Sequence, residues 1–224
     1  MSDCGKRSKW ESVKELMGDD KVILGRYLSY QFKSSPRRIL YSMSYYKFAA
    51  KVIGTCKRVL DVGCGEGLGT WLLATECGQA KGIDMDKDSI DIGNKNWKDP
   101  RVSFECSDFL NRKQDQCDAL VILDVIEHIL PENESRFFKE CVDCLNPDGI
   151  AIIGTPNVTS QVFAKDITKA GHVNLFSGDR IEDRMRQYFS NVFIFGANDE
   201  VIHTGFRPMA HYLIAIGCGK RKGV

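Results

Sequence analysis

The chain has 224 residues with 43% hydrophobic content, a length that fits one domain around one sizeable core rather than two independent domains. Lysine and arginine number 31 against 30 for aspartate and glutamate, so the net charge of +1 gives no reason to expect nucleic acid or another polyanion as partner. No apolar run approaches the ~20 residues of a membrane span, and the polar start has no signal-peptide core. The composition predicts a soluble, cytoplasmic protein without membrane contact.

The nine cysteines are spread along the chain, and only Cys141 and Cys144 form a C-x-x-C pair. No second ligand pair accompanies them, and they fall within a helical pattern. We therefore expect reduced thiols that pack as small apolar residues.

The first 54 residues are expected to be helical. Residues 8–17 place four apolar side chains at helical spacing, and a Gly-Asp-Asp run ends the pattern. Residues 21–54 are rich in aromatic side chains and are interrupted at Pro36, which predicts two further helices. This N-terminal helical cap either closes over a ligand or buries an edge of the sheet.

Residues 58–74, RVLDVGCGEGLGTWLLA, are the most informative stretch of the chain. An apolar run over residues 59–62 predicts a buried strand, and glycines interrupt it before a helical run over residues 70–74. Glycines in such a turn permit positive φ and close approach of a ligand, and the following helix offers free N–H groups. The stretch therefore predicts a ligand bound across the turn.

The spacing of the glycines indicates which ligand is bound. Gly63, Gly65 and Gly67 form G-x-G-x-G, whereas a dinucleotide fingerprint requires glycine at the sixth place. Asp61 and Glu66 flank the turn, and these acids would repel a pyrophosphate but suit a ligand that carries an ammonium and a sulfonium group. S-adenosylmethionine fits this description.

A second acid is expected to reach the ribose hydroxyls from the end of the next strand, predicted at residues 79–83. Asp84 lies 84 − 63 = 21 residues past the first glycine, near the expected ~20. The alternative is that Asp84 caps the helix predicted at residues 86–97.

The motifs DVGCGEG at 61–67 and GIDMD at 82–86 resemble those of class I S-adenosylmethionine-dependent methyltransferases. The resemblance covers residues 50–218. It implies an α/β fold, with a Rossmann-like sheet of seven mostly parallel strands, helices on both faces and the last strand antiparallel. S-adenosylmethionine would be the cofactor and S-adenosylhomocysteine the product.

The resemblance also implies a division of the chain. An N-terminal helical cap at 1–54 would precede a methyltransferase domain at 55–219, and a basic tail would follow at 220–224. An irregular stretch at 155–180 would be an insertion that faces the substrate.

Asp108 is the expected contact to the adenine base. Residues 101–106 alternate as a third strand does, and they deliver Asp108 into the following loop. The resemblance implies that this acid accepts from the adenine amino group, with Met85 and Phe109 as apolar faces for the base. A phenylalanine after a strand also often belongs to the core.

Three ionisable residues follow the predicted central strand. Residues 117–123, CDALVIL, form the apolar run typical of a parallel strand buried on both faces. Asp124, Glu127 and His128 come next, at the carboxyl end where open α/β sheets bind ligands. If the chain turns helical here, their i, i+3 and i+4 spacing puts them on one face. They are the predicted catalytic residues, and Asp124 is also a predicted cofactor contact.

His128 has three interpretations. As a general base it would take the hydroxyl proton of the acceptor, a task that suits an unperturbed imidazole. As a metal ligand it would join Asp124, Glu127 and the distant His172 around a divalent ion, as the resemblance to small-RNA and ubiquinone-pathway methyltransferases implies. The third interpretation is a structural histidine. We rank the base first and the metal second.

The last two strands are expected at residues 191–195 and 211–216. A long loop joins them, and it carries His203 and Arg207 as candidate acceptor contacts. Both residues could equally be solvated loop residues.

The resemblance favours methyl transfer to an oxygen, and less so to a nitrogen, of a small-molecule or sugar-like acceptor. LDVIEHI replaces the Asn/Asp-Pro-Pro-aromatic run of the enzymes of this class that methylate amino groups of DNA and RNA. The alternatives are an RNA-terminal 2′-hydroxyl methyltransferase and a non-catalytic module that binds the cofactor and a partner. The neutral charge favours the small acceptor, and the oligomeric state stays open.

Overall fold

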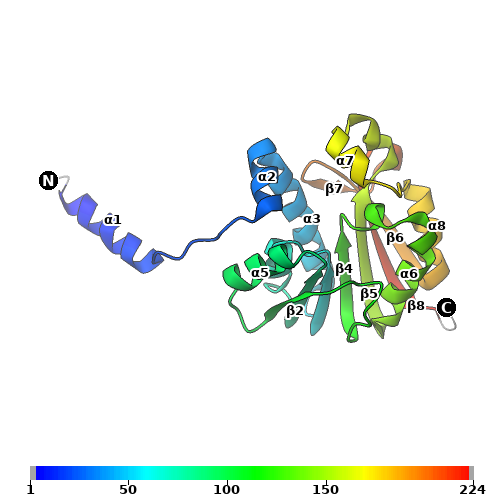
Figure 1. The fold of residues 1–224 in the computed structure, drawn as a ribbon, viewed down its shortest axis with the longest axis horizontal. Coiled ribbons are helices and arrows are strands. Elements are labelled where there is room, and N and C mark those ends of the chain that lie inside the picture. Colours follow the sequence, from blue (N-terminus) through cyan, green and yellow to red (C-terminus); the bar gives the residue numbers. More distant parts are fainter. Residues whose placement is uncertain (1–3, 222–224) are drawn as a thin grey trace.

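The computed structural model describes residues 4–221, and its centre is a sheet of eight strands in the order β3-β2-β1-β4-β5-β8-β6-β7 (Figure 1). The strands are β1 (Arg58–Val62), β2 (Gln79–Asp84), β3 (Val102–Cys106), β4 (Cys117–Leu123), β5 (Leu145–Pro156), β6 (Phe189–Asn198), β7 (Val201–His203) and β8 (Tyr212–Lys220). Strands β1 to β5 pair in parallel, and β8 runs antiparallel between β5 and β6. The predicted α/β fold with an antiparallel last strand is confirmed.

The predicted count of seven strands is wrong by one. The three residues of β7 pair with residues 196–198 at the end of β6, and Asp199 turns the hairpin with a φ of 52°. A strand of three residues is too short to show an alternating apolar and polar pattern, so the sequence predicted a loop for this segment.

Helices connect the strands on both faces of the sheet (Figure 1). The α-helices of residues 4–221 are α1 (Cys4–Met17), α2 (Arg26–Ser34), α3 (Arg37–Ile53), α4 (Leu68–Leu73), α5 (Lys87–Asn96), α6 (Glu134–Asp143), α7 (Asp166–Gly171) and α8 (Gly178–Tyr188). Short 3₁₀ helices in the same range are η1 (Ile126–His128), η2 (Pro131–Asn133), η3 (Val158–Phe163) and η4 (Arg207–Met209). None of these helices is long and apolar enough to cross a bilayer.

The alternation of side chains along the central strands divides the core into two layers. On β4, Leu120 and Ile122 join one cluster of buried side chains, while Val121 and Leu123 join the other. Successive residues of a strand point to opposite faces, so a strand covered on both faces is apolar throughout. This explains the continuous apolar run CDALVIL.

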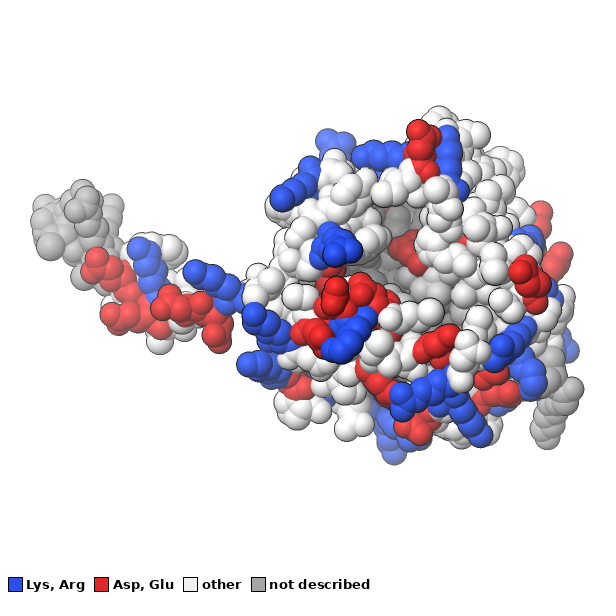
Figure 2. Space-filling model, viewed as in Figure 1, with Lys and Arg blue, Asp and Glu red and all other residues white. Residues whose placement is uncertain are grey.

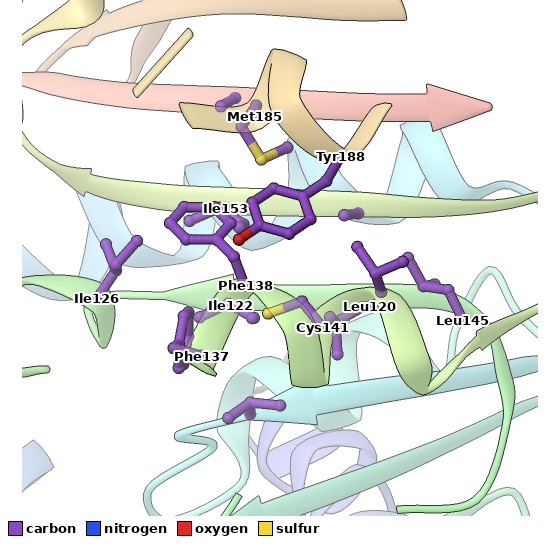
Figure 3. Close-up of a cluster of buried hydrophobic side chains, with 14 of the residues drawn as sticks. Leu120, Ile122, Ile126, Phe137, Phe138, Cys141, Leu145, Ile153, Met185 and Tyr188 are labelled. Carbon is purple, nitrogen blue, oxygen red and sulfur yellow. The ribbon is translucent and has the colours of Figure 1, made fainter. Parts of the chain in front are cut away.

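Helices α6 and α8 cover one face of the sheet (Figure 3). Phe137, Phe138 and Cys141 of α6 are fully buried there, and the Phe138 ring stacks on Tyr188 of α8 with 5.6 Å between centroids. Helices α3 and α4 cover the other face. Because the helices fill both faces, the ligand site is left to the loops at the carboxyl ends of the strands.

The N-terminal helices do not form one cap. Helix α3 buries five residues against the sheet, so it belongs to the core. Helix α2 lies over the carboxyl ends of the strands, whereas α1 stands away from the body at the end of an extended segment (Figure 1). The predicted cap includes residues 1–3 and the predicted basic tail includes residues 222–224, which lie outside the described residues.

The described cysteines are free thiols, and most are buried. Cys117, Cys141 and Cys144 lie in the core, and burial raises the pKa of the Cys141 thiol well above its usual value. Cys144 donates to the carbonyl of Cys141 at 3.3 Å. The expectation of thiols that pack as small apolar residues agrees with this arrangement.

Candidate active site

The glycine loop between β1 and α4 has the backbone that its sequence predicts. Gly63, Gly65 and Gly67 have φ values of 75°, 53° and 81°, in the region that favours glycine. A Cβ on Gly63 would lie 2.3 Å from Val125, and a Cβ on Gly67 would lie 2.4 Å from the Phe104 ring, so packing also requires these two glycines. A Cβ on Gly65 would meet nothing within 4 Å. Gly65 is therefore where a ligand can approach the loop.

Asp84 ties the end of β2 to the glycine loop. One carboxylate oxygen accepts from the N–H of Gly65 at 2.9 Å, and the other accepts from the N–H of Asp86 at 2.8 Å. Each oxygen keeps a second lone pair. The N-cap of α5 is Asp86, which accepts from the N–H of Asp88, so the alternative role of Asp84 as a helix cap does not apply.

Asp61 lies behind the glycine loop and does not reach solvent. Its carboxylate accepts from the hydroxyl of Thr70 at 2.5 Å and from the phenol of Tyr46 at 3.2 Å. Burial raises the pKa of Asp61 to about 7 despite these two donors. Asp61 thus holds α3 and α4 against the glycine loop. Its side chain supports the loop from behind instead of making the direct contact to the cofactor that the sequence predicted.

Glu66 also has a role that its sequence position did not indicate. It is 2% exposed, and its two carboxylate oxygens accept from the backbone N–H groups of Tyr27 and Leu28 at 2.9 and 3.0 Å. These N–H groups belong to the first turn of α2, where helical donors lack partners. Glu66 of the glycine loop therefore caps the N-terminus of α2 and holds this helix against the loop. It takes the place of a capping side chain from a neighbouring residue in the sequence.

The predicted adenine contacts lie in different surroundings. Asp108 is half-buried and accepts from the N–H of Leu110 at 2.9 Å and from the side chain of Asn111 at 2.5 Å. Met85 is 71% exposed at the end of β2. Phe109 packs edge-on against Phe137 in the core, so core packing accounts for this ring and we exclude it from the site.

Asp124 ends β4 in a conformation that non-glycine residues rarely adopt. Its φ is 58°, and its N–H donates to the carbonyl of Gly154 at 3.1 Å and to the Tyr212 hydroxyl at 3.2 Å. Such backbone strain persists where the surrounding structure enforces it, and it is frequent at functional sites. Because the chain turns left-handed here and then forms the 3₁₀ helix η1, the predicted helical face of Asp124, Glu127 and His128 does not form.

Asp124 stays in contact with solvent, although the surrounding protein removes part of the water around its carboxyl. The loss of water raises the pKa of its carboxyl above the usual value, and the nearby charges of His128 and Arg38 only partly offset this. Figure 2 shows acidic side chains in the depth of a hollow on this face.

The structure brings Glu127, His128 and His172 together. One potential ligand atom from each lies within 4.8 Å of the others, and the two imidazole centroids are 5.1 Å apart. Asp124, the fourth candidate ligand, is not part of this cluster. His172 follows α7, so the stretch predicted as a substrate-facing insertion supplies one member of the cluster.

Glu127 is buried and incompletely paired. Its Oε2 accepts from the hydroxyl of Thr155 at 3.1 Å, while its Oε1 has no hydrogen-bond partner. Burial, and next the charge of Asp124, raise the pKa of Glu127 well above the usual range. A buried carboxylate oxygen without a partner is unfavourable, and a proton or a cation would satisfy it.

Backbone contacts hold the two histidines in place. His128 Nδ1 lies 2.7 Å from the carbonyl of Gly171, which fixes the tautomer with the proton on Nδ1 and leaves the Nε2 lone pair free. The N–H groups of Val173 and Asn174 donate to the carbonyl of Glu127 at 2.9 and 3.0 Å. These contacts align the segment after α7 with η1.

A buried ionic network supports the same segment from below. Asn174 donates to Glu134, and Glu134 also pairs with Arg180 and Arg184 of α8.

Burial, and next the neighbouring His128, lower the pKa of His172, which keeps its imidazole neutral. A neutral imidazole is the form that can bind a metal ion.

Helix α2 brings Tyr27 to the same hollow. Loss of water raises the pKa of its phenol to about 12, and the nearby carboxylate of Asp124 raises it further, while Gln31 and Arg38 oppose this. Arg38, at the start of α3, donates to Gln31 at 3.4 Å. The sequence did not single out Tyr27, because a tyrosine in an aromatic-rich segment carries no positional signal.

Comparison with protein families matches residues 59–149 to a methyltransferase domain. The ubiquinone biosynthesis O-methyltransferase of Coxiella burnetii (strain RSA 493) is 27% identical over 121 residues, which cover 52% of this chain and 51% of that protein. The corresponding enzyme of Rickettsia typhi is 32% identical over 119 residues, covering 52% of this chain and 48% of that protein. The chain thus spans about half the length of the curated relatives it matches.

Solved structures share the fold. A methyltransferase from Archaeoglobus fulgidus superposes with a TM-score of 0.66 at 18% identity, covering 88% of this chain and 100% of that one. The N-methyltransferase NodS from Bradyrhizobium japonicum, in complex with S-adenosylhomocysteine, has a TM-score of 0.59 at 17% identity and coverages of 84% and 87%. The methyltransferase domain of bacterial CtHen1-C has a TM-score of 0.63 at 19% identity and coverages of 80% and 97%.

The sheet order and the glycine loop define a Rossmann-like α/β fold with its ligand site at the carboxyl ends of the strands. Residues 59–149 are similar to a methyltransferase domain, and the solved structures share the fold of the chain. The described residues fit S-adenosylmethionine, the cofactor that the sequence motifs predict. Gly65 leaves open space, and Asp84 keeps lone pairs beside that space.

Proposed function

We propose that this chain transfers a methyl group from S-adenosylmethionine to a hydroxyl oxygen, with the acceptor oriented by a divalent ion held by Glu127, His128 and His172. The main support for this proposal is the cluster of three potential ligand atoms that lie within 4.8 Å of one another. One of them belongs to a buried carboxylate with an unpaired oxygen. One carboxylate and two neutral imidazoles form a donor set that suits Mn²⁺, Fe²⁺ or Zn²⁺ better than Mg²⁺.

The residues fit an ion at this place. Oε1 of Glu127 would gain the partner that it lacks, and Nε2 of His128 is the free nitrogen. The contact of His128 with the carbonyl of Gly171 is the outer contact that orients metal-binding histidines in proteins. A bound ion would supply Lewis-acid polarisation of the acceptor hydroxyl.

The residues around the cluster have distinct roles in this proposal. Asp84 and the glycine loop hold the cofactor, whose sulfonium activates the methyl group, so alignment of acceptor oxygen, methyl carbon and sulfur is the main catalytic effect. If Nε2 of His128 binds an ion, Asp124 is the group that accepts the hydroxyl proton. If no ion binds, Nε2 of His128 is itself the general base, as the sequence first suggested.

Oxygen is the favoured methyl acceptor for two reasons. The similarity to ubiquinone biosynthesis O-methyltransferases supports it. In addition, a hydroxyl polarised by a cation loses its proton more easily, whereas an amine that is protonated at neutral pH has no lone pair for the ion or the methyl group. A small-molecule or sugar-like hydroxyl is therefore the proposed acceptor.

A second candidate is the terminal 2′-hydroxyl of RNA. The similarity to the methyltransferase domain of bacterial CtHen1-C and the clustered acid and histidines favour it. The opposing observation is the near-neutral charge of the whole chain.

The test measures S-adenosylhomocysteine release with matched acceptors in the presence of Mn²⁺. We expect turnover with catechol or a nucleoside, little with an aliphatic amine such as benzylamine, and loss of turnover on adding a chelator, restored by Mn²⁺. Turnover that a chelator leaves unchanged would support His128 as general base without metal. Cofactor binding without turnover across hydroxyl and amine acceptors would favour the non-catalytic partner module.

A further inference from the structure

The charge of the chain is unevenly distributed along the sequence. Residues 21–60 contain no aspartate or glutamate but nine basic residues: Lys21, Arg26, Lys33, Arg37, Arg38, Lys47, Lys51, Lys57 and Arg58. The rest of the chain then has 31 − 9 = 22 basic residues against 30 acidic ones. The net charge of +1 is therefore the sum of a strongly basic segment, residues 21–60, and an acidic remainder of the chain.

Most of this positive charge is not neutralised by ion pairs. Among the salt bridges of residues 4–221, only one involves this segment, between Lys51 and Glu76. Arg26, Lys33 and Arg37 are exposed on α2 and at the start of α3. Unpaired surface cations that share one element attract anions.

Exposed aromatic rings alternate with these cations on α2. Tyr27, Tyr30 and Phe32 are 55%, 42% and 54% exposed, although large rings gain from burial. Cations that hold a phosphate backbone and rings on which bases stack are the combination by which proteins bind single-stranded nucleic acid. A simple anion such as sulfate would require the cations but not the rings.

This basic aromatic surface adjoins the methyl-transfer site. Glu66 of the glycine loop docks the first turn of α2 through the N–H groups of Tyr27 and Leu28. Lys165 lies just before α7 and Lys169 lies within it, and the end of α7 leads to His172. Figure 2 shows basic side chains along the upper rim of the hollow and acidic ones in its depth.

We propose that the methyl acceptor is a nucleotide, whose phosphate and base lie on α2 while its ribose hydroxyl reaches the Glu127–His128–His172 cluster. This rests on the proposed function and names its substrate class. The charge pattern sets the orientation, because the carboxylate of Asp124 repels a phosphate while the exposed Arg26, Lys33 and Arg37 attract it. The nucleotide comes either from the end of a single strand or as a free nucleotide.

The test measures fluorescence anisotropy of a 5′-fluorescein-labelled single-stranded RNA, about ten nucleotides long, at several salt concentrations. A variant combining Arg26→Gln, Lys33→Gln and Arg37→Gln removes three exposed cations. A matched control combines Lys95→Gln, Lys113→Gln and Lys139→Gln, three exposed lysines outside the basic segment. The slope of log affinity against log salt should fall by about 2 in the first variant, at ~0.7 for each lost contact, and stay unchanged in the control.

Phe32→Ala tests the stacking contribution, and we expect about tenfold weaker binding with the salt slope unchanged. If the RNA does not bind but a fluorescent adenine mononucleotide binds and depends on the same three cations, the acceptor is a free nucleotide. Failure of both probes to bind, or equal binding by the two triple variants, would overturn the inference. Mn²⁺ binding and methylation of catechol, measured on the same protein, report separately on the proposed function.

Discussion

At the scale of single residues, Asp84 is the clearest determinant of cofactor affinity. Its carboxylate already accepts two backbone N–H groups, and its remaining lone pairs can accept the ribose hydroxyls. Asp84→Ala should weaken S-adenosylmethionine binding about tenfold or more, since unpaired buried donors cost ~1–3 kcal/mol. Titration calorimetry measures this. Asp86→Ala is the control, because it removes the α5 cap and should lower thermal stability with little change in affinity.

Asp61 should make stability depend on pH. Burial raises its pKa to about 7 from a usual 3.8, so the native protein keeps a proton that the unfolded chain loses. Its stabilising effect is complete below about pH 3.8 and is lost as the pH rises through 7. The free energy of unfolding should therefore decline over this range by up to ~1.4 kcal/mol per pH unit from this group.

Urea unfolding of the wild type and Asp61→Asn between pH 4 and 8 measures the effect as the difference between the two curves. The variant should show the flatter profile. The exposed Asp91→Asn is the control and should follow the wild type. Parallel curves for wild type and Asp61→Asn would show that Asp61 ionises normally in the folded protein.

The sequence located these acids but not all their tasks. Asp84 could be placed because a strand and a counted spacing fix its position. Asp61 and Glu66 looked like ligand contacts, yet their partners Tyr46, Tyr27 and Leu28 lie on helices whose packing no local pattern encodes. The left-handed backbone of Asp124 likewise depends on tertiary contacts, which explains why the helical-face prediction was wrong.

At the scale of elements, the docking of α2 depends on Glu66. Glu66→Ala should leave the N–H groups of Tyr27 and Leu28 without an acceptor, at the ~1 kcal/mol typical of a lost helix cap. Because local opening governs access to protease, chymotrypsin should cleave within α2 about fivefold faster. Time courses resolved by mass spectrometry locate the cuts.

Two further variants make this experiment specific. Glu66→Gln keeps one acceptor oxygen and should give an intermediate cleavage rate. Glu76→Ala removes an acid that pairs with the exposed Lys51, and it should cleave like the wild type. Equal rates for Glu66→Ala and the wild type would mean that other contacts hold α2.

Predictability also differed among elements. Strands β1, β2, β3, β4, β6 and β8 were located, and for β1 and β4 burial on two faces produces an apolar run that stands out in the sequence. Strand β7 was missed, since its three residues form through pairing with β6 rather than through their own pattern. The 3₁₀ helices η1 and η3 are too short for a periodic signal.

At the scale of the whole molecule, the fold brings the residues of the candidate site together at one edge of the sheet. The glycine loop, Asp84, Asp124 and the η1 segment all follow carboxyl ends of parallel strands, and α2 and α7 close over them from distant parts of the sequence. Composition averaged over the chain hid the segregation of charge, because an acidic floor and a basic rim cancel in a sum.

The central claim is that Glu127, His128 and His172 hold one divalent ion. Its most direct measurement is calorimetric titration of Mn²⁺ into the wild type and into Glu127→Gln, His128→Ala and His172→Ala. The exposed His211→Ala is the control.

We predict one Mn²⁺ per chain in the wild type and in His211→Ala, weaker Mg²⁺ binding, and at least about tenfold loss of Mn²⁺ affinity in each cluster variant. Wild-type protein that binds no Mn²⁺, or cluster variants that bind it as tightly as the wild type, would contradict the claim.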